Sequence, residues 1–323
     1  MTRWKDWAQL VRVPNTLTAC ADTLAGFSIA VGVWHVSHAI PLVLASCASI
    51  CMYWAGMALN DVNDIEEDKQ NCRKGPIVEG RISLQSAWLA GWGLLIAGVV
   101  LSVVAACMLA DTNRLMRVVW PCMTAILLAA TIVLYDSPIK KSILGPWFMG
   151  ACRSLNLLLG FAIGLAAIPD IAERIEDLKS TLLVLPLAHG LFVVGITLAA
   201  RKESVWKQSS LWLAISWLVS FIAVVGLAFS TLFVSQDLPL RLDPKGGFPL
   251  LIALMSVPWM IRAVRSVRDG TIGSLVPAIK QAILTILFLD AAVALQFAGN
   301  VAGLIVCALA VPTFALGRWF RVT

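Results

Sequence analysis

Long apolar runs separated by short polar stretches extend from one end of this chain to the other. A helix needs about 20 mostly apolar residues to cross the roughly 30 Å hydrocarbon layer of a bilayer. We therefore predict an all-α polytopic membrane protein, a bundle of nine to ten transmembrane helices in one domain, residues 1–323. A count of nine spans stays possible because the break between the last two, at Ala298-Gly299-Asn300, is the least certain of the predicted breaks. The predicted spans are Leu17–Trp34, Ile40–Leu59, Ser86–Ala110, Val118–Tyr135, Gly145–Ile168, Thr181–Ala200, Leu211–Val234, Phe248–Ile261, Pro277–Phe297 and Val301–Gly317.

The composition supports a membrane location. Hydrophobic residues make up 59% of the 323 residues and charged residues 14%, and the mean hydropathy is +0.84. A soluble domain is about a quarter charged, so we expect no second, soluble domain. The eight cysteines are scattered without paired metal-ligand spacing, and His35 and His38 lack a third ligand nearby. No removable signal peptide is expected, because the N-terminal segment is amphipathic.

The basic residues indicate how the chain is oriented, not that it binds nucleic acid. The net charge is +6. If the spans alternate, most Lys and Arg residues fall on the side that holds both termini, and cytoplasmic loops carry such an excess. We therefore expect the termini and the acidic segment described next to be cytoplasmic. A short helix on the membrane surface is expected from Arg3, Trp4, Lys5, Trp7 and Arg12.

An acidic segment follows the second predicted span and reads Asn60-Asp61-Val62-Asn63-Asp64-Ile65-Glu66-Glu67-Asp68. Asn60, Asp64 and Asp68 are four residues apart, so a helix places them on one face. Crowded carboxylates at a membrane surface need a cationic partner. Hard oxygen ligands suit Mg²⁺, and bound Mg²⁺ usually holds a phosphate as well. We therefore predict that these three residues form a catalytic Mg²⁺ site, with Asp61 or Glu67 as helpers.

Three loops are expected to lie on the same side of the membrane as this segment. Arg73 and Lys74 follow it directly, Lys140 lies in the loop after the fourth span, and Arg201 ends the sixth span. These cations either solvate helix ends, as cytoplasmic loops commonly do, or hold the oxygens of a metal-bound diphosphate. The nearby acids favour the second interpretation most clearly for the first loop.

Several polar side chains fall at membrane depth. An ionised group that faces lipid costs about 3 kcal/mol or more, so we expect these residues to face the interior, to pair, or to line a water-filled site. Pairing of Arg153 with an acid and its contact with substrate both stay open. His189 is expected to bond a neighbouring helix, and Asp290 is expected to be structural. The residues are Asn15 and Asp22 in the first span, Arg153 and Asn156 in the fifth, His189 in the sixth and Asp290 in the ninth.

The spacing Asn60-x₃-Asp64-x₃-Asp68 resembles the first aspartate-rich motif of the UbiA superfamily of intramembrane prenyltransferases. The Gly75-Pro76-Ile77 stretch, the loop from Tyr135 to Lys140-Lys141 and Asn15 fit the same family in span order. The resemblance implies a helical bundle around a cavity that opens sideways to lipid. There an isoprenoid diphosphate binds through Mg²⁺ and ionises, and its allylic cation alkylates an acceptor. Substrate-binding roles are then expected for Arg73, Lys74, Lys140, Arg153, Asn156, Arg201 and Asn15.

The chain departs from that family at the end of the sixth span, where a second stack of aspartates is usual. Thr197 and Arg201 stand at the acid positions, and Glu203 is the nearby carboxylate. Either Arg201 and Lys202 replace the charge of a second metal directly on the diphosphate, or phosphate binding survives and the chemistry has been lost. This pattern is similar to the Ebo-cluster UbiA-like (EboC) subgroup.

Two function classes follow. The favoured one is a Mg²⁺-dependent prenyltransferase that uses an isoprenoid diphosphate and a membrane-associated acceptor, aromatic or other. The alternative is a non-catalytic lipid-binding, diphosphate-binding or transport component with the same fold. An unrelated transporter has little support, because no inverted repeat of broken helices is evident.

Overall fold

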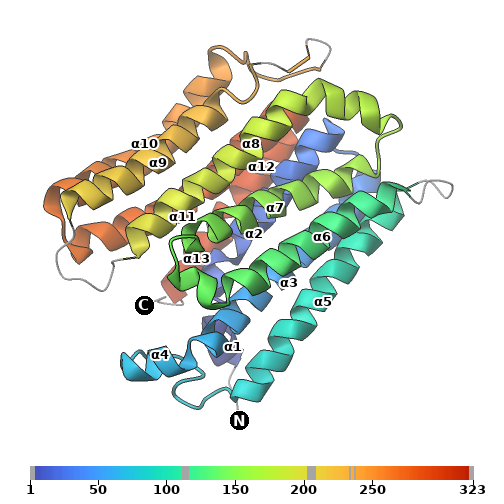
Figure 1. Cartoon of the computed structure of the whole chain (residues 1–323). Coiled ribbons are helices and arrows are strands. Elements are labelled where there is room, and N and C mark those ends of the chain that lie inside the picture. The colour runs from blue at the N-terminus through green and yellow to red at the C-terminus, as the bar shows by residue number, and fades with distance from the viewer. Residues whose placement is uncertain (1–3, 111–115, 202–208, 233, 236–237, 320–323) are drawn as a thin grey trace.

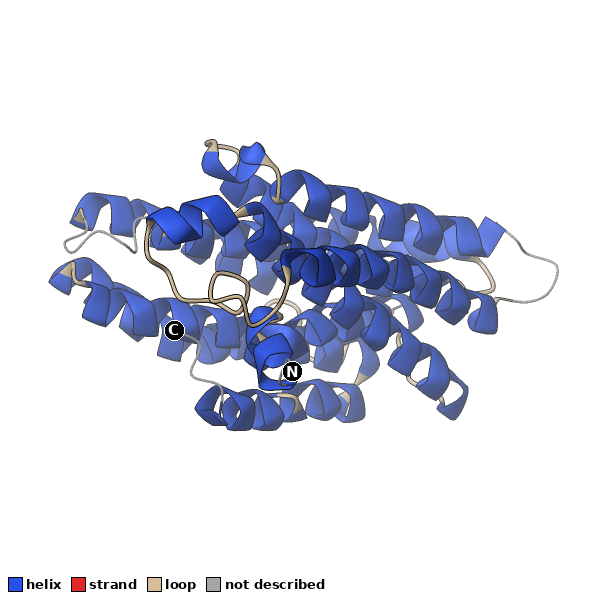
Figure 2. Ribbon diagram, turned by 90° about the horizontal axis from the view of Figure 1, so that it is seen from below, coloured by secondary structure: helices blue, strands red, loops and turns tan. Residues whose placement is uncertain are grey.

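The long helices of this protein lie side by side as a bundle (Figure 1). The computed structural model describes residues 4–110, 116–201, 209–232, 234–235 and 238–319, and all regular structure in these ranges is helical (Figure 2). The predicted all-α fold class is therefore confirmed. The elements are α1 Trp4–Leu10, α2 Val13–Val31, η1 Val36–His38, α3 Ala39–Asn63, α4 Ile65–Gln70, α5 Leu84–Leu109, α6 Met116–Tyr135, η2 Pro138–Lys141, α7 Gly145–Leu165, α8 Ile171–Ala200, α9 Ser210–Ala228, α10 Gly247–Asp269, α11 Ile272–Ala298, α12 Asn300–Ala308 and α13 Ala310–Trp319.

Within the described ranges, nine helical stretches are long and apolar enough to cross a membrane, which agrees with the predicted nine to ten. One of these stretches joins η1 to α3, and the last joins α12 to α13. Helix α2 is not among the nine although it has 19 residues, because polar residues such as Asn15 and Asp22 interrupt its apolar sequence. Most of its side chains are buried against other helices.

Helix α8 differs most from its prediction, since it begins at Ile171 and not near Thr181. Asp170 caps its N-terminus by accepting a hydrogen bond from the backbone of Glu173 at 3.0 Å. At 1.5 Å per residue, the 30 residues of α8 reach about 45 Å, which exceeds the roughly 30 Å hydrocarbon layer. Apolar periodicity does not reveal the first turns, because they are polar and extend past the apolar layer.

Helices α2 and α7 approach each other closely because of two glycines. A Cβ atom at Gly26 would overlap the carbonyl oxygen of Leu157, and one at Gly160 would overlap the carbonyl oxygen of Thr23. Small residues permit such backbone contact in membrane bundles. This contact holds the polar side chains of α2 and α7 against one another.

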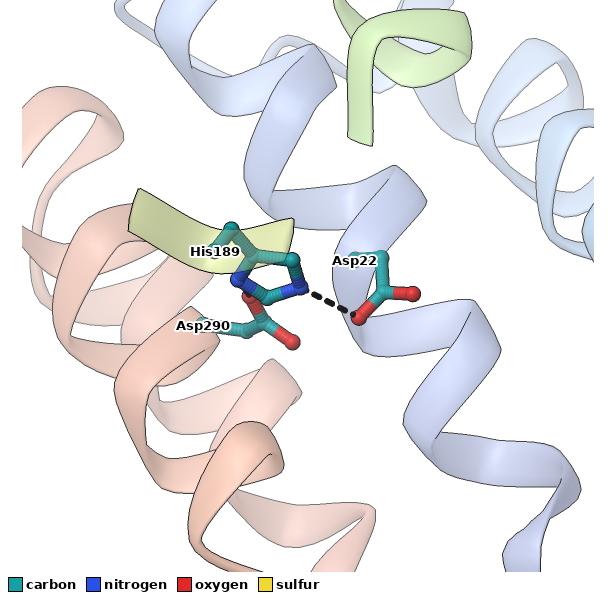
Figure 3. Close-up of side chains that lie close together, drawn as sticks. All are labelled: Asp22, His189 and Asp290. Atoms are coloured by element: carbon teal, nitrogen blue, oxygen red, sulfur yellow. Dashed lines mark hydrogen bonds and ion pairs between the residues drawn. The ribbon is translucent and has the colours of Figure 1, made fainter. Parts of the chain in front are cut away.

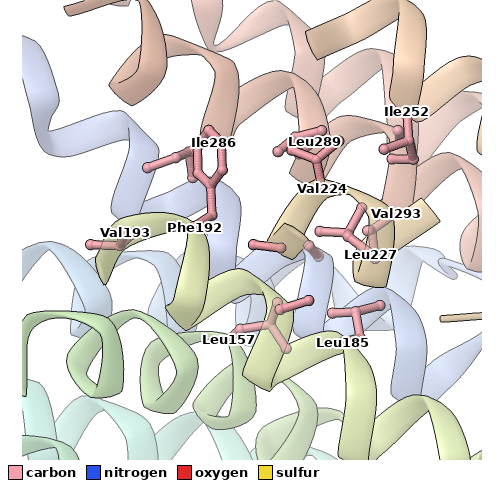
Figure 4. Packing of buried hydrophobic residues seen from close by; sticks show 14 of the residues in the cluster. Leu157, Leu185, Phe192, Val193, Val224, Leu227, Ile252, Ile286, Leu289 and Val293 are labelled. Atoms are coloured by element: carbon pink, nitrogen blue, oxygen red, sulfur yellow. The ribbon is translucent and has the colours of Figure 1, made fainter. Parts of the chain in front are cut away.

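Apolar side chains fill the space between α7, α8, α9 and α11 (Figure 4). Leu157, Leu185, Phe192, Leu227 and Ile286 belong to this cluster and are almost completely buried. The outer faces of the bundle carry many large apolar side chains that stay exposed, as a surface in contact with lipid requires. Close packing between helices, more than removal of apolar area from water, stabilises such an interior.

A smaller cluster anchors the segment that follows α4. Leu10 of α1, Ala58 of α3 and Ile82 are buried together. Asp6 of α1 also forms an ion pair with Arg81. The predicted N-terminal helix is therefore present as α1, although Arg3 lies outside the described residues. The C-terminal end of the loop that carries the basic residues after α4 is thus fixed to the bundle.

Candidate functional site

The acidic segment lies where α3 passes into α4. The helical hydrogen bonds continue through the junction, from the Asp64 N–H to the Asn60 carbonyl at 3.0 Å and from the Asp68 N–H to the Asp64 carbonyl at 2.8 Å. The four-residue spacing of Asn60, Asp64 and Asp68 is therefore a helical spacing in the structure too. Their amide and carboxylate oxygens are the hard ligands that Mg²⁺ prefers, so the donor set fits this ion.

Lys140 joins the second basic loop to this segment. Its Nζ donates a hydrogen bond to Asn60 Oδ1 at 3.1 Å and forms an ion pair with Asp64. The Ser137 hydroxyl starts the short helix η2 by accepting a hydrogen bond from the Ile139 N–H at 3.3 Å, which presents Lys140 to the acids. The structure thus brings together two loops that the sequence placed only on the same side of the membrane.

The other acids of the segment also have cationic partners. Asp61 pairs with Arg12 at 3.2 Å, and Asp68 pairs with Arg73 at 3.2 Å. Glu67 pairs with Lys141 at 2.6 Å, and this ammonium group lowers the pKa of Glu67 below its usual range. The segment is therefore largely neutralised by the protein itself. Lys74 lies exposed next to Arg73.

Arg201 does not contact the acidic segment. Its Nη2 donates to the backbone carbonyl of Lys140 at 3.1 Å and to that of Ser142. The guanidinium group is thus engaged by the loop that carries Lys140, and direct contact of Arg201 with a diphosphate stays a prediction. Lys202 and Glu203 lie outside the described residues.

A cavity of about 100 Å³ lies beside this loop between α2, α3, α6 and α7. Its wall is mostly apolar, with a few polar groups among the described residues. Asn15 lies near the start of α2, where its carbonyl accepts a hydrogen bond from the Thr18 hydroxyl at 2.8 Å, and its contact with substrate stays a prediction. A narrow apolar space near a basic side chain such as Lys140 suits a hydrocarbon chain attached to a negatively charged group. The lining residues are Ala19, Ser49, Met52, Tyr53, Gly56, Met57, Leu128, Ile132, Tyr135, Asp136, Met149, Cys152, Arg153 and Asn156.

Arg153 and Asn156 line the cavity, and both also bind Asp22 of α2. Arg153 Nη1 lies 2.8 Å from Asp22 Oδ2, and Nη2 donates to the Thr18 hydroxyl at 2.8 Å. Asn156 Nδ2 donates to Asp22 Oδ2 at 3.0 Å. The first of the two interpretations of Arg153, pairing with an acid, is thus confirmed. Contact with substrate stays a prediction.

His189 lies between Asp22 and Asp290 in the interior of the bundle (Figure 3). Its Nε2 is 3.0 Å from Asp22 Oδ1, and its Nδ1 is 3.6 Å from Asp290 Oδ1. The prediction that His189 bonds a neighbouring helix is confirmed. The sequence did not indicate that these residues form one cluster, because they belong to three distant helices.

The charges of this cluster limit what it can bind. If Asp22 and Asp290 were both ionised, their two negative charges would exceed the one positive charge of Arg153, which pairs with Asp22. A net charge in an apolar interior is costly, so the cluster needs one more positive charge. A single proton on His189 or Asp290 supplies that charge, whereas a divalent cation would leave an excess of one.

Asp136 is a cavity residue that the sequence analysis did not single out. It is 4% exposed and directly follows α6. Its Oδ2 is buried without a hydrogen-bond partner among the described residues. Burial raises the pKa of Asp136 from its usual value to about 8. An acid placed directly after an apolar span was the available signal, but the chain has several acids in such places.

A sequence profile of the UbiA prenyltransferase family matches residues 21–323. The digeranylgeranylglyceryl phosphate synthase of Saccharolobus solfataricus is 23% identical to this chain, over 80% of the chain and 86% of the relative. The synthase of the same name from Methanococcus aeolicus is 37% identical over 98 residues, which are 30% of this chain. That match spans 35% of the relative's own length.

Solved structures share the fold. A UbiA homolog from Archaeoglobus fulgidus bound to DMAPP and Mg²⁺ superposes with a TM-score of 0.58 at 17% identity, covering 94% of this chain and 99% of the homolog. A digeranylgeranylglyceryl phosphate synthase structure gives a TM-score of 0.60 at 18% identity, covering 92% of this chain and 99% of that one. At such identities the likeness shows the fold alone, and the bundle is therefore UbiA-like.

Proposed function

Because the chain belongs to the UbiA prenyltransferase family, we propose that it transfers a prenyl group from an isoprenoid diphosphate to a membrane-associated acceptor with the help of Mg²⁺. One observation carries this proposal. Lys140 contacts both Asn60 and Asp64, and the wall of the apolar cavity includes Asp136, four positions before Lys140, and Met57, three positions before Asn60. A cation, the proposed oxygen ligands of a metal and a space for a hydrocarbon chain therefore occur on neighbouring parts of the same two segments.

The roles follow from the charges. Asn60, Asp64 and Asp68 hold Mg²⁺, which stabilises the negative charge that grows on the leaving diphosphate. Arg73, Lys74 and Lys140 bind the remaining diphosphate oxygens. Cleavage of the carbon–oxygen bond leaves an allylic cation, and the apolar cavity wall keeps water away from it.

Arg201 serves this site indirectly. Its hydrogen bonds to the carbonyls of Lys140 and Ser142 hold the loop that presents Lys140. A second metal of the usual kind is not part of the proposal, because Thr197 and Arg201 stand where acids would be needed. This substitution is also the reason to propose membership of the EboC subgroup within the family.

The donor and the acceptor are proposed from relatives. The A. fulgidus homolog was solved with DMAPP and with GPP, each with Mg²⁺. The named relatives make digeranylgeranylglyceryl phosphate. A prenyl diphosphate is therefore the proposed donor, and a prenylglyceryl phosphate is the first acceptor to test. We further propose that the acidic segment and both termini face the cytoplasm, from the distribution of Lys and Arg.

The competing function is a non-catalytic lipid-binding, diphosphate-binding or transport component. The observation that favours it is the same loss of acids at Thr197 and Arg201. Such a protein would bind a prenyl diphosphate without cleaving it. The two functions therefore differ in a single measurable event, the release of diphosphate.

The decisive experiment uses purified protein in lipid nanodiscs with labelled prenyl diphosphates of several chain lengths. The proposal expects Mg²⁺-dependent diphosphate release and a prenylated product identified by mass. Asp64→Ala should abolish release, whereas Glu66→Ala should not, because Glu66 is 77% exposed and, among the described residues, pairs with Lys69 alone. Binding without release for every chain length would favour the non-catalytic component.

A further inference from the structure

We propose that Asp136 binds the nucleophilic group of the acceptor, a neutral hydroxyl, and takes up its proton during transfer. This inference rests on the proposed function and extends it to the acceptor. It assigns a catalytic role to a residue outside the Asn60, Asp64 and Asp68 set.

The position of Asp136 is the first argument. Among the described residues that line the cavity, it is the one that carries a carboxylate. It also stands between the two parts of the site. It lies four positions before Lys140, which contacts Asp64, and it shares the cavity wall with Tyr53 and Arg153. A group at this place reaches an acceptor that lies against the end of the prenyl chain next to the diphosphate.

The unsatisfied oxygen is the second argument. Asp136 Oδ2 is buried and accepts no hydrogen bond from the described residues. Buried carboxylate oxygens are rarely left without a donor, because desolvation without a partner is costly. By contrast, the other charged group of the wall, Arg153, is neutralised by Asp22. The cavity therefore offers a hydrogen-bond acceptor to the substrate and little net positive charge, which suits a hydroxyl better than an anionic nucleophile.

The surrounding charges are the third argument. Lys140 and Arg12 favour the ionised form of Asp136, whereas Asp64 and Asp61 oppose it, and burial is the largest influence. Together they raise its pKa to about 8. A general base works best when its pKa lies near the working pH.

The proposed step balances. The acceptor oxygen forms a bond to C1 of the prenyl group, and the bond between C1 and the diphosphate oxygen breaks. Its electron pair leaves with the diphosphate. The hydroxyl proton moves to the Asp136 carboxylate, which later returns it to water. No oxidant, reductant or further reactant is required.

The test compares Asp136→Asn with wild type in nanodiscs. Asn has nearly the same shape but accepts no proton, and Glu66→Gln is the matched control on an exposed carboxylate. Two quantities are measured with Mg²⁺ present. One is the formation of labelled lipid from geranylgeranyl diphosphate and geranylgeranylglyceryl phosphate, with a total lipid extract as a second acceptor source. The other is the affinity for geranylgeranyl thiolodiphosphate, an analogue that is cleaved slowly.

The expected result is that Asp136→Asn lowers product formation about 100-fold or more, the usual range for loss of a general base, and leaves affinity for the analogue unchanged. Product formation equal to that of wild type would overturn the inference. Equal loss of product and of analogue affinity would also overturn it, because Asp136 would then belong to the diphosphate site. If wild type itself neither releases diphosphate nor forms product, the proposed function fails first, and the role of Asp136 fails with it.

Discussion

Lys140 and Asp64 form an ion pair between two segments that are 76 residues apart in the chain. Both side chains are only 15% exposed, so water screens their interaction weakly. The pair ties the loop after α6 to the end of α3, and Arg201 holds the same loop from α8. This relationship between two charges therefore determines the shape of the proposed diphosphate site.

Replacing Lys140 tests that site directly. Lys140→Met is expected to weaken the binding of geranylgeranyl thiolodiphosphate about 10-fold to 100-fold, since a hydrogen bond to a charged group contributes about 1.5–3 kcal/mol. Binding is measured with labelled analogue at saturating Mg²⁺. Lys69→Met is the control, because Lys69 is 51% exposed and forms its ion pair, within the described part of the chain, with Glu66. Equal affinity of both variants would contradict the role of Lys140.

Arg201→Ala should have a smaller effect on the same measurement. The guanidinium group contacts backbone carbonyls of the loop, so its loss loosens the position of Lys140 without removing a charge from the diphosphate. We expect a weaker loss of analogue affinity than in Lys140→Met, together with a lower kcat. A loss of affinity larger than that of Lys140→Met would show instead that Arg201 binds the diphosphate directly.

The ion pair between Arg153 and Asp22 should stabilise the bundle. Arg153→Leu leaves the fully buried Asp22 carboxylate without its main cation, and removal of one partner from a buried pair usually costs about 3–5 kcal/mol. Thermal unfolding in detergent measures the effect as a lower Tm. Lys179→Leu removes an exposed pair with Glu176 and should leave Tm nearly unchanged. Similar Tm values for the two variants would contradict this account.

Alanine at Gly160 should separate α2 from α7. The added Cβ would overlap the Thr23 carbonyl oxygen, so the helices must move apart and their polar contacts lengthen. We expect a clear loss of thermal stability and of activity. Gly93→Ala is a matched control inside α5, because no atom lies within 4 Å of its Cβ position. This control should be neutral or slightly stabilising.

The pKa of Asp136 predicts opposite effects of pH on stability and on turnover. The folded state keeps the carboxyl protonated up to about pH 8, whereas the unfolded chain loses that proton near pH 4. The folded state therefore binds more protons between these values, and stability falls by up to about 1.4 kcal/mol per pH unit as pH rises through this window. Turnover should rise over the same upper range, because the base becomes available.

Both pH effects should vanish in Asp136→Asn, which has no proton to lose. Tm is measured from pH 5 to pH 9 in wild type and in the variant, and the difference between the two curves isolates this carboxyl group. A constant difference across the range would show that the pKa of Asp136 is not raised.

The sequence predicted the features that depend on residues close together along the chain. The spacing of Asn60, Asp64 and Asp68 follows from helical geometry, and the spans follow from apolar length. The start of α8 at Ile171 did not follow, because its first turns are polar. The length of an apolar run therefore predicts the limits of a membrane span better than the limits of the helix that contains it.

Contacts between distant helices required the structure. Whether Asp22, His189 and Asp290 meet depends on the rotation of α2, α8 and α11 about their axes, and apolar helices carry little information about that rotation. The partner of Arg201 was likewise open, since a basic residue at a helix end has several acceptors within reach. In each case the sequence identified a polar or charged residue of interest but did not show which neighbour its side chain contacts.

The acids of the α3–α4 junction have consequences for how a ligand enters. Arg12, Arg73, Lys140 and Lys141 already pair with these acids, so the charges of the segment are largely balanced within the protein. A divalent metal ion that bound alone would displace these basic side chains and leave them without anionic partners. A metal–diphosphate complex carries positive and negative charge together. The acids can then bind the metal ion while the basic side chains bind the diphosphate, so each side chain exchanges one partner for another. We therefore expect the site to bind a metal–diphosphate complex more readily than the metal ion alone.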